Sequence, residues 1–171
     1  MNPTDQPPAP TIDLEGMKQY FARQLDIVVA YLFGSVARGR AHKLSDVDVA
    51  VLFAPEVGLE ESVERQLQLM GDLEQFADRE VQVTVLNRAT PLLAYQVVKY
   101  GILLYERSRA ERVDFYVRTL SIYFDFKPTL DLLNRAVERR IKEGRFGHRR
   151  DRHPSAVDTA RELLRPRLRA D

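Results

Sequence analysis

The chain has 171 residues, of which 44% are hydrophobic and 30% are charged, with 8 glycines and 9 prolines. These values are typical of one folded domain with a modest appendix, and they exclude two full enzyme domains, a collagen-like chain and a wholly disordered one. The sequence contains no cysteine, so disulfides, zinc–thiolate sites and a thiol nucleophile are excluded, and a metal site would be built from carboxylates. No apolar run approaches the ~20 residues of a membrane span, and residues 1–10 lack a signal-peptide pattern, which predicts a cytoplasmic protein without membrane contact.

Charge is distributed unevenly, although the formal net charge is only +1. Residues 1–105 contain 9 basic and 14 acidic residues, a net charge of −5, whereas residues 106–171 contain 17 basic and 11 acidic residues, a net charge of +6. A basic tail of this kind is compatible with a nucleic acid, an acidic partner protein or the acidic half of the same chain. We expect a solvated segment rather than a nucleic-acid site at its densest basic run, Arg145, Arg149, Arg150 and Arg152.

The pattern of residues 11–106 predicts an α/β domain, which follows a Pro-rich disordered leader at residues 1–10. Apolar residues at helical spacing from Thr11 to Leu25 predict a first helix capped by Thr11. The later elements in chain order are a buried strand at 27–33, a short helix after Gly34, a buried strand at 47–53, a helix at 59–76, a strand at 81–86, a helix at 91–99 ended by Gly101 and a strand at 102–105. A sheet covered by helices is the expected result.

The pattern of residues 107–171 predicts a basic, helical C-terminal extension without strands. One helix is expected from Arg109 and another from Pro128 to Gly144, and a third, basic helix is expected at 155–168. Residues 144–154 have few apolar side chains and are predicted to form a linker. Aromatic residues at helical spacing are expected to be core or partner contacts: Tyr116, Tyr123, Phe124 and Phe126.

The chemistry of the sequence is concentrated between the two buried strands, in Gly34-Ser35 and in Asp46-Val47-Asp48. Gly34 and Ser35 stand where a strand gives way to a helix, so that backbone N–H groups and a hydroxyl can face a phosphate. Asp46 and Asp48 are two positions apart at the start of a strand, so alternation turns both carboxylates toward one face. Each half alone is common in proteins that bind neither phosphate nor metal, but together they favour a site for Mg²⁺ and a nucleoside triphosphate.

Two segments resemble the signature of the minimal nucleotidyltransferases of the DNA polymerase β-like superfamily: Leu32-Phe33-Gly34-Ser35-Val36-Ala37-Arg38-Gly39 and Leu44-Ser45-Asp46-Val47-Asp48-Val49-Ala50-Val51-Leu52. Residues 85–89 and 123–128 also resemble the branch that acts as antitoxin to HEPN-domain RNase toxins. The resemblance implies an α/β fold with a small mixed sheet of the polymerase β-like palm type, flanking helices and a C-terminal helical extension. It further implies transfer of AMP from ATP to a tyrosine hydroxyl of a HEPN toxin, which is the partner in a hetero-oligomer and is silenced by the modification.

The resemblance also implies roles for individual residues. Gly34 and Ser35 would bind the triphosphate of ATP. Asp46 and Asp48 would bind Mg²⁺ and act as the catalytic pair. Arg38 would contact phosphate. Independently of the resemblance, Lys43 and Ser45 complete the expected nucleotide-binding set, and Arg40 is a weaker candidate because flexible loop cations are usually solvated.

One position departs from the superfamily pattern, which commonly places a third carboxylate on a neighbouring strand to help deprotonate the attacking hydroxyl. Gln82 stands at that place, and an amide neither accepts a proton at neutral pH nor binds Mg²⁺ strongly. Asp78 and Glu80, just before this strand, are the acids that would substitute for it. Two alternatives therefore stay open: an antitoxin that only binds its partner through a vestigial site, and a nucleotidyltransferase that acts on a small molecule or RNA. The extension of roughly 65 residues is small for the second domain that a small-molecule acceptor pocket needs.

Overall fold

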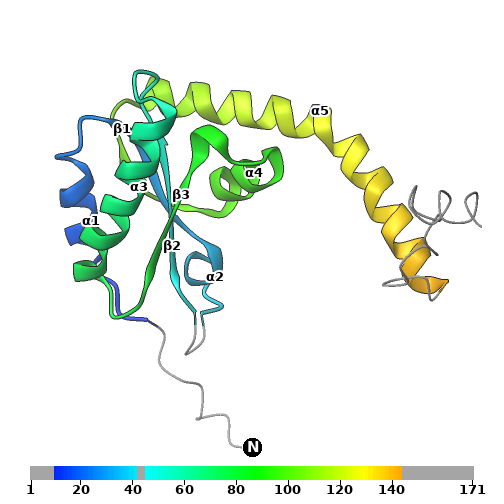
Figure 1. The fold of residues 1–171 in the computed structure, drawn as a ribbon, viewed down its shortest axis with the longest axis horizontal. Coiled ribbons are helices and arrows are strands. Elements are labelled where there is room, and N and C mark those ends of the chain that lie inside the picture. Colours follow the sequence, from blue (N-terminus) through cyan, green and yellow to red (C-terminus); the bar gives the residue numbers. More distant parts are fainter. Residues whose placement is uncertain (1–9, 42–44, 144–171) are drawn as a thin grey trace, which may run out of the picture. The chain divides into compact units, whose positions relative to one another are not determined.

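The computed structural model describes residues 10–41 and 45–143, and its centre is a mixed four-stranded sheet in the order β3-β2-β1-β4 (Figure 1). The strands are β1 (Ile27–Phe33), β2 (Val47–Phe53), β3 (Val81–Val85) and β4 (Ile102–Glu106). β1 pairs antiparallel with β2 and β4, whereas β2 and β3 are parallel. The predicted fold class, a small mixed sheet with flanking helices and a C-terminal helical segment, is confirmed.

The helices cover both faces of this sheet. They are α1 (Leu14–Phe21), α2 (Gly34–Ala37), α3 (Leu59–Leu73), α4 (Pro91–Tyr100) and α5 (Arg109–Lys142), with short 3-10 helices η1 (Glu74–Phe76) and η2 (Leu86–Arg88). α1 and α3 lie on one face, and α4 lies on the other (Figure 1). No helix in residues 10–41 and 45–143 combines the length and the apolar character that crossing a lipid bilayer requires.

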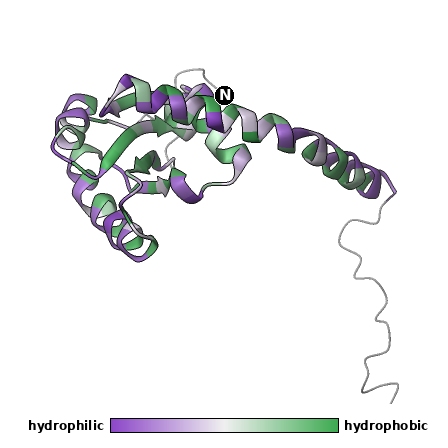
Figure 2. Cartoon of the chain, turned by 90° about the horizontal axis from the view of Figure 1, so that it is seen from above, coloured by the Kyte–Doolittle hydropathy of each residue, from purple (hydrophilic) through white to green (hydrophobic). Residues whose placement is uncertain are grey.

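The hydrophobic core follows from the strand sequences, which are mostly hydrophobic (Figure 2). In β2, Val47 and Val49 point into the cluster built with α1 and α3, whereas Ala50 belongs to the cluster that includes Val97 of α4. Asp48 therefore lies on the α4 face, because side chains alternate along a strand.

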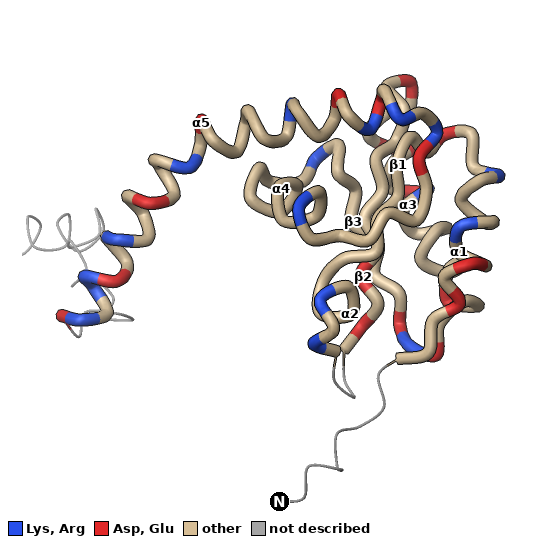
Figure 3. The backbone as a smooth tube through the Cα atoms, turned by 180° about the vertical axis from the view of Figure 1, so that it is seen from behind, with Lys and Arg blue, Asp and Glu red and all other residues tan. Residues whose placement is uncertain are grey.

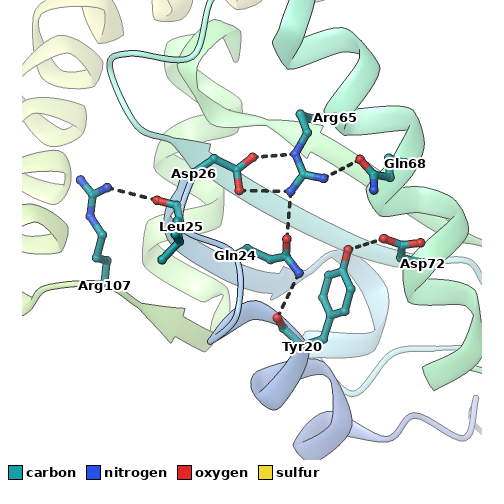
Figure 4. A network of polar contacts seen from close by, with 8 residues as sticks. All are labelled: Tyr20, Gln24, Leu25, Asp26, Arg65, Gln68, Asp72 and Arg107. Atoms are coloured by element: carbon teal, nitrogen blue, oxygen red, sulfur yellow. Dashed lines mark hydrogen bonds and ion pairs between the residues drawn. The ribbon is translucent and has the colours of Figure 1, made fainter.

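A polar network joins α1, the start of β1 and α3 (Figure 4). The guanidinium of Arg65 in α3 donates two hydrogen bonds to the carboxylate of Asp26, at 2.6 and 3.1 Å, and one to Gln24 at 3.0 Å. The hydroxyl of Tyr20 in α1 donates to Asp72 at 2.6 Å. Partial burial raises the pKa of Tyr20, and this hydrogen bond raises it further. A two-point Arg–carboxylate contact fixes orientation as well as distance, so the network holds α1 and α3 together at the end of the sheet where β1 begins.

The start of the first helix differs from the prediction. The helix begins at Leu14, and its N-cap is Asp13, whose side chain accepts the backbone N–H of Gly16 at 2.9 Å. The predicted cap, Thr11, instead donates its backbone N–H to Asp78 at 3.0 Å. The predicted helix boundary was wrong because a carboxylate two residues later caps the same turn.

The predicted helix break at Pro128 is also wrong, since α5 runs through Pro128 from Arg109 to Lys142. Proline has no N–H to donate to the carbonyl of Phe124, and Phe124 is an exposed residue, so a water molecule can donate to that carbonyl instead. The chain divides into two compact units, residues 1–127 and 128–171. The predicted division into residues 1–10, 11–106 and 107–171 stays a prediction. The third helix at 155–168, the linker at 144–154 and all but the last residue of the leader lie outside the described residues.

Candidate functional site

The two halves of the sequence motif meet where β1 ends and β2 begins. Phe33, the last residue of β1, pairs with Asp48 in β2, and the chain then turns at Gly34, whose φ is +76°. A Cβ atom on Gly34 would lie 1.9 Å from Oδ2 of Asp48. Only glycine allows both this backbone conformation and this approach, so Gly34 lets the turn lie directly against the carboxylate.

The two aspartates act on each other electrostatically. Asp46 and Asp48 are half-buried, and Val47 between them points into the core on the opposite face. Burial raises the pKa of the Asp48 carboxyl, and the negative charge of Asp46 raises it further. Carboxylates that repel one another in this way are stabilised by a cation between them.

Gln82 lies beside this pair, as the sequence predicts. The parallel register of β2 and β3 sets Gln82 opposite Asp48, and its Nε2 donates a hydrogen bond to Oδ2 of Asp46 at 2.9 Å. The two acids considered as substitutes are exposed, and Asp78 accepts the backbone N–H of Thr11 at 3.0 Å. The third position of the site is therefore an amide that donates to a carboxylate.

The donor set agrees with what Mg²⁺ accepts. Within residues 10–41 and 45–143 there is no group of three or more His, Cys, Asp or Glu side chains arranged to hold a metal ion. Magnesium is commonly held by only one or two protein carboxylates, with water and substrate phosphate oxygens as the other ligands. Asp46 and Asp48 supply those two carboxylates, so the residues fit the ion.

A cavity of about 510 Å³ lies next to Gly34, between α2 and α4. Arg38 crosses it: its Nη2 donates to Oε1 of Gln96 at 2.5 Å, and its guanidinium carbon is 5.0 Å from the ring centre of Tyr100. Figure 3 shows Lys and Arg segments at α2 next to Asp and Glu segments at the start of β2. The lining residues are Phe33, Gly34, Ser35, Arg38, Arg40, Thr90, Leu92, Leu93 and Gln96.

The predicted nucleotide-binding residues are only partly brought together. Ser35, Arg38 and Arg40 line the cavity, whereas Ser45 is buried just before β2. Lys43 lies outside the described residues. α2 has only four residues, so any anion binding there would depend on individual backbone N–H groups rather than on a helix dipole.

The α4 wall was missed by the sequence analysis. Its helix was predicted, but no local signal marks Leu92, Leu93 or Gln96 as site residues, because their role depends on how α4 packs against the sheet.

Comparison with known proteins identifies the family. Residues 15–110 match the family described as Polymerase beta, Nucleotidyltransferase, which is more than half of the chain. The chain therefore belongs to this nucleotidyltransferase family.

Individual proteins similar to this chain have more specific descriptions than the family. The protein adenylyltransferase MntA of Shewanella oneidensis is 34% identical over 93 residues, which are 54% of this chain and 63% of MntA, so the match spans less than two thirds of that relative. A crystal structure of a toxin–antitoxin with AMP-PNP has a TM-score of 0.59 and 26% identity, covering 74% of this chain and 99% of that chain. The complex of tri-AMPylated Shewanella oneidensis HEPN toxin with MNT antitoxin has a TM-score of 0.55 over 73% of this chain and 98% of that chain, and at 23% identity it shows the shared fold alone.

Proposed function

We propose that this chain is the antitoxin of a HEPN toxin–antitoxin pair and that it transfers AMP from ATP to a tyrosine of the toxin, which silences the RNase. The observation that carries the proposal is the contact of Gly34 with Asp48, which joins a phosphate-binding turn to a carboxylate pair beside a cavity of about 510 Å³. The similarity to the protein adenylyltransferase MntA supports AMP as the transferred group. The similarity to a toxin–antitoxin with AMP-PNP supports a toxin as the partner and ATP as the donor.

In this proposal the polar wall of the cavity binds the triphosphate. The backbone N–H groups of Gly34 and Ser35, with the Ser35 hydroxyl, donate to phosphate oxygens. Arg38 and Arg40, which also line the cavity, add positive charge. Lys43 and Ser45, which come shortly before Asp46 in the sequence, complete the proposed set.

Asp46 and Asp48 hold Mg²⁺ in this proposal. When bound, the ion polarises the phosphate and aligns it for attack. The hydrogen bond from Gln82 to Asp46 fixes the orientation of that carboxylate, and the contact with Gly34 sets the position of Asp48.

The transfer exchanges one bond for another. The tyrosine oxygen of the toxin forms a bond to the α-phosphorus, the bond from this phosphorus to the bridging oxygen breaks, pyrophosphate leaves, and the phenolic proton passes to water. A phenol has a pKa of about 10, the lowest among protein hydroxyl groups, so it needs the least help from a base. An amide at position 82 is therefore compatible with a tyrosine acceptor.

A second function has one observation in its favour. Gln82 occupies the position of a base but cannot accept a proton, which favours an antitoxin that neutralises its partner by binding alone. Asp46 and Asp48 favour the enzyme, because a protein that only binds has no use for a repelling carboxylate pair.

Intact-mass spectrometry of the partner separates the two functions. The chain is co-expressed with the protein encoded by the neighbouring gene, once as wild type and once as Asp46→Asn with Asp48→Asn. We expect one or more AMP adducts on the partner with the wild type and none with the double variant. Inhibition of the RNase without an adduct in either case would favour binding alone, and adducts in both would contradict the roles of Asp46 and Asp48. Peptide mapping of the adducts gives the acceptor residue and the number of AMP groups.

A further inference from the structure

The cavity beside the proposed phosphate site is lined by two chemically different kinds of residue. Ser35, Arg38 and Arg40 supply polar and positively charged groups to the lining, and Arg38 reaches across to Gln96 of α4. α4 also contributes Leu92 and Leu93, which are apolar. A nucleoside triphosphate is divided in the same way, because its phosphates are charged and its base is a flat ring with two apolar faces.

Gln96 is the polar residue of α4 that faces this cavity. It lies three and four positions after Leu93 and Leu92, so the three side chains share one face of the helix. Its Oε1 accepts the hydrogen bond from Nη2 of Arg38 at 2.5 Å, whereas its Nε2 has no acceptor within the described part of the chain. Arg38 is in turn held over the ring of Tyr100, one helical turn further along α4. The carboxamide is therefore fixed at one end and presents N–H donors at the other.

We infer that α4 binds the nucleoside of the nucleotide and that Gln96 recognises its base, by donating from Nε2 to a ring nitrogen of adenine while Leu92 and Leu93 pack against the ring. This inference rests on the proposed transfer of AMP and adds the residue that selects the base. Ring nitrogens of adenine are acceptors without a proton, and a glutamine amide is a common partner for adenine.

A purely positioning role for Gln96 makes a different prediction. If Gln96 only holds Arg38, its loss affects the phosphate contacts, and any ligand with a triphosphate loses affinity. If Gln96 contacts the base, only ligands that carry the base lose affinity. Inorganic tripolyphosphate, which has the phosphates without the nucleoside, separates the two roles.

Calorimetry of the full chain with ATP and with tripolyphosphate, both with Mg²⁺, tests the inference. We expect Gln96→Ala to weaken ATP binding by about 3- to 10-fold, the range for loss of one uncharged hydrogen bond, and to leave tripolyphosphate binding within about twofold. Gln96→Met, which keeps the volume of the side chain without its N–H groups, should behave in the same way. Gln75→Ala is the matched control, because Gln75 is exposed in η1 and donates to the backbone of Asp72 at 2.8 Å, outside the cavity.

A set of deaza analogues of ATP provides the atomic test. The analogue that lacks the accepting ring nitrogen should bind wild type and Gln96→Ala equally, whereas analogues that retain it should show the full difference. If no analogue among the 1-, 3- and 7-deaza forms removes the difference, Gln96 does not contact a ring nitrogen and the inference is wrong.

The other outcomes are equally decisive. Equal weakening of ATP and tripolyphosphate binding in Gln96→Ala would show that Gln96 acts only through Arg38. Unchanged ATP binding would show that Gln96 neither positions Arg38 nor contacts the base. Either result overturns the inference even if AMP transfer to the toxin persists. If ATP binding depends on Gln96 but the toxin carries no AMP, the proposed function fails and the base recognition stands. If wild type binds neither ligand, both are overturned.

Discussion

Two glycines with left-handed backbone conformations provide a matched test of the site. Gly34 has φ +76° and Gly39 has φ +63°. A Cβ atom on Gly34 would meet Asp48, whereas one on Gly39 would meet nothing within 4 Å. The variants Gly34→Ala and Gly39→Ala therefore share the backbone penalty and differ in the contact with the carboxylate.

The expected magnitudes follow from these contacts. Placing alanine in a left-handed conformation costs about 1–2 kcal/mol of folding free energy in either variant. In Gly34→Ala the new Cβ would be 1.9 Å from Oδ2 and 2.8 Å from Cγ of Asp48, but 3.1 Å from its Cβ, so rotation of the carboxylate relieves the clash. An off-rotamer side chain costs about 1 kcal/mol, so we expect Gly34→Ala to be less stable than Gly39→Ala by no more than that.

The effect on transfer should be much larger than the effect on stability. Rotation moves the Asp48 carboxylate from its place beside Asp46, and a misplacement of about 1 Å in a catalytic group can cost about 100-fold in rate. Urea unfolding measures the stability of both variants, and the initial rate of AMP incorporation into the toxin measures transfer. We expect a loss of about 100-fold for Gly34→Ala and a rate near that of wild type for Gly39→Ala. Equal rates in the two variants would refute the argument that the Gly34–Asp48 contact positions the carboxylate.

Three further predictions concern the charges and the C-terminal unit. Asp46→Asn with Asp48→Asn should abolish transfer, but it should not lower the free energy of unfolding measured without divalent cations. Folding raises the pKa of Asp48, so the wild type loses stability as the pH rises from the ordinary aspartate pKa through the raised value. Urea unfolding over a pH series should show that loss only in the wild type. Gln82→Asp should raise transfer by about tenfold or more if a base is missing, and an unchanged rate would mean that another group removes the proton. Deletion from Lys127 onward should weaken toxin binding more than ATP binding, because exposed apolar residues of α5 are removed; calorimetry that finds an unchanged affinity for the toxin would contradict this role.

The strands and the motif were predictable because their signals are local. β1 is a continuous apolar run, and its residues 27–32 are all buried, as such a run predicts. The position of Gln82 could also be predicted from the sequence. A strand parallel to β2 places every second residue on the same face of the sheet as Asp48, and Gln82 is one of these residues. By contrast, nothing near Gln96 in the sequence indicates a site, because its contact with Arg38 joins residues 58 positions apart.

Helix ends were less predictable than helix existence. The first helix was expected to begin at Thr11, but Asp13 is its N-cap. Threonine and aspartate are both favoured at the N-cap, so the local sequence does not decide between the two positions. Pro128 was expected to start a new helix because proline removes a backbone donor. α5 nevertheless continues through Pro128, four residues after the exposed Phe124, so the penalty is overridden.

The amide at position 82 has opposite consequences for stability and for chemistry. In the chain without metal, Gln82 donates to Asp46, whose neighbour Asp48 is already disfavoured as an anion by burial and by the charge of Asp46. A third carboxylate there would lose that hydrogen bond and add repulsion, so Gln82→Asp should lower the unfolding free energy without Mg²⁺, and with Mg²⁺ it should speed transfer only if a base is missing. A variant that gained rate without losing stability would show that the hydrogen bond to Asp46 contributes nothing to the fold. A tyrosine acceptor, which needs little help from a base, allows the chain to keep the more stable arrangement.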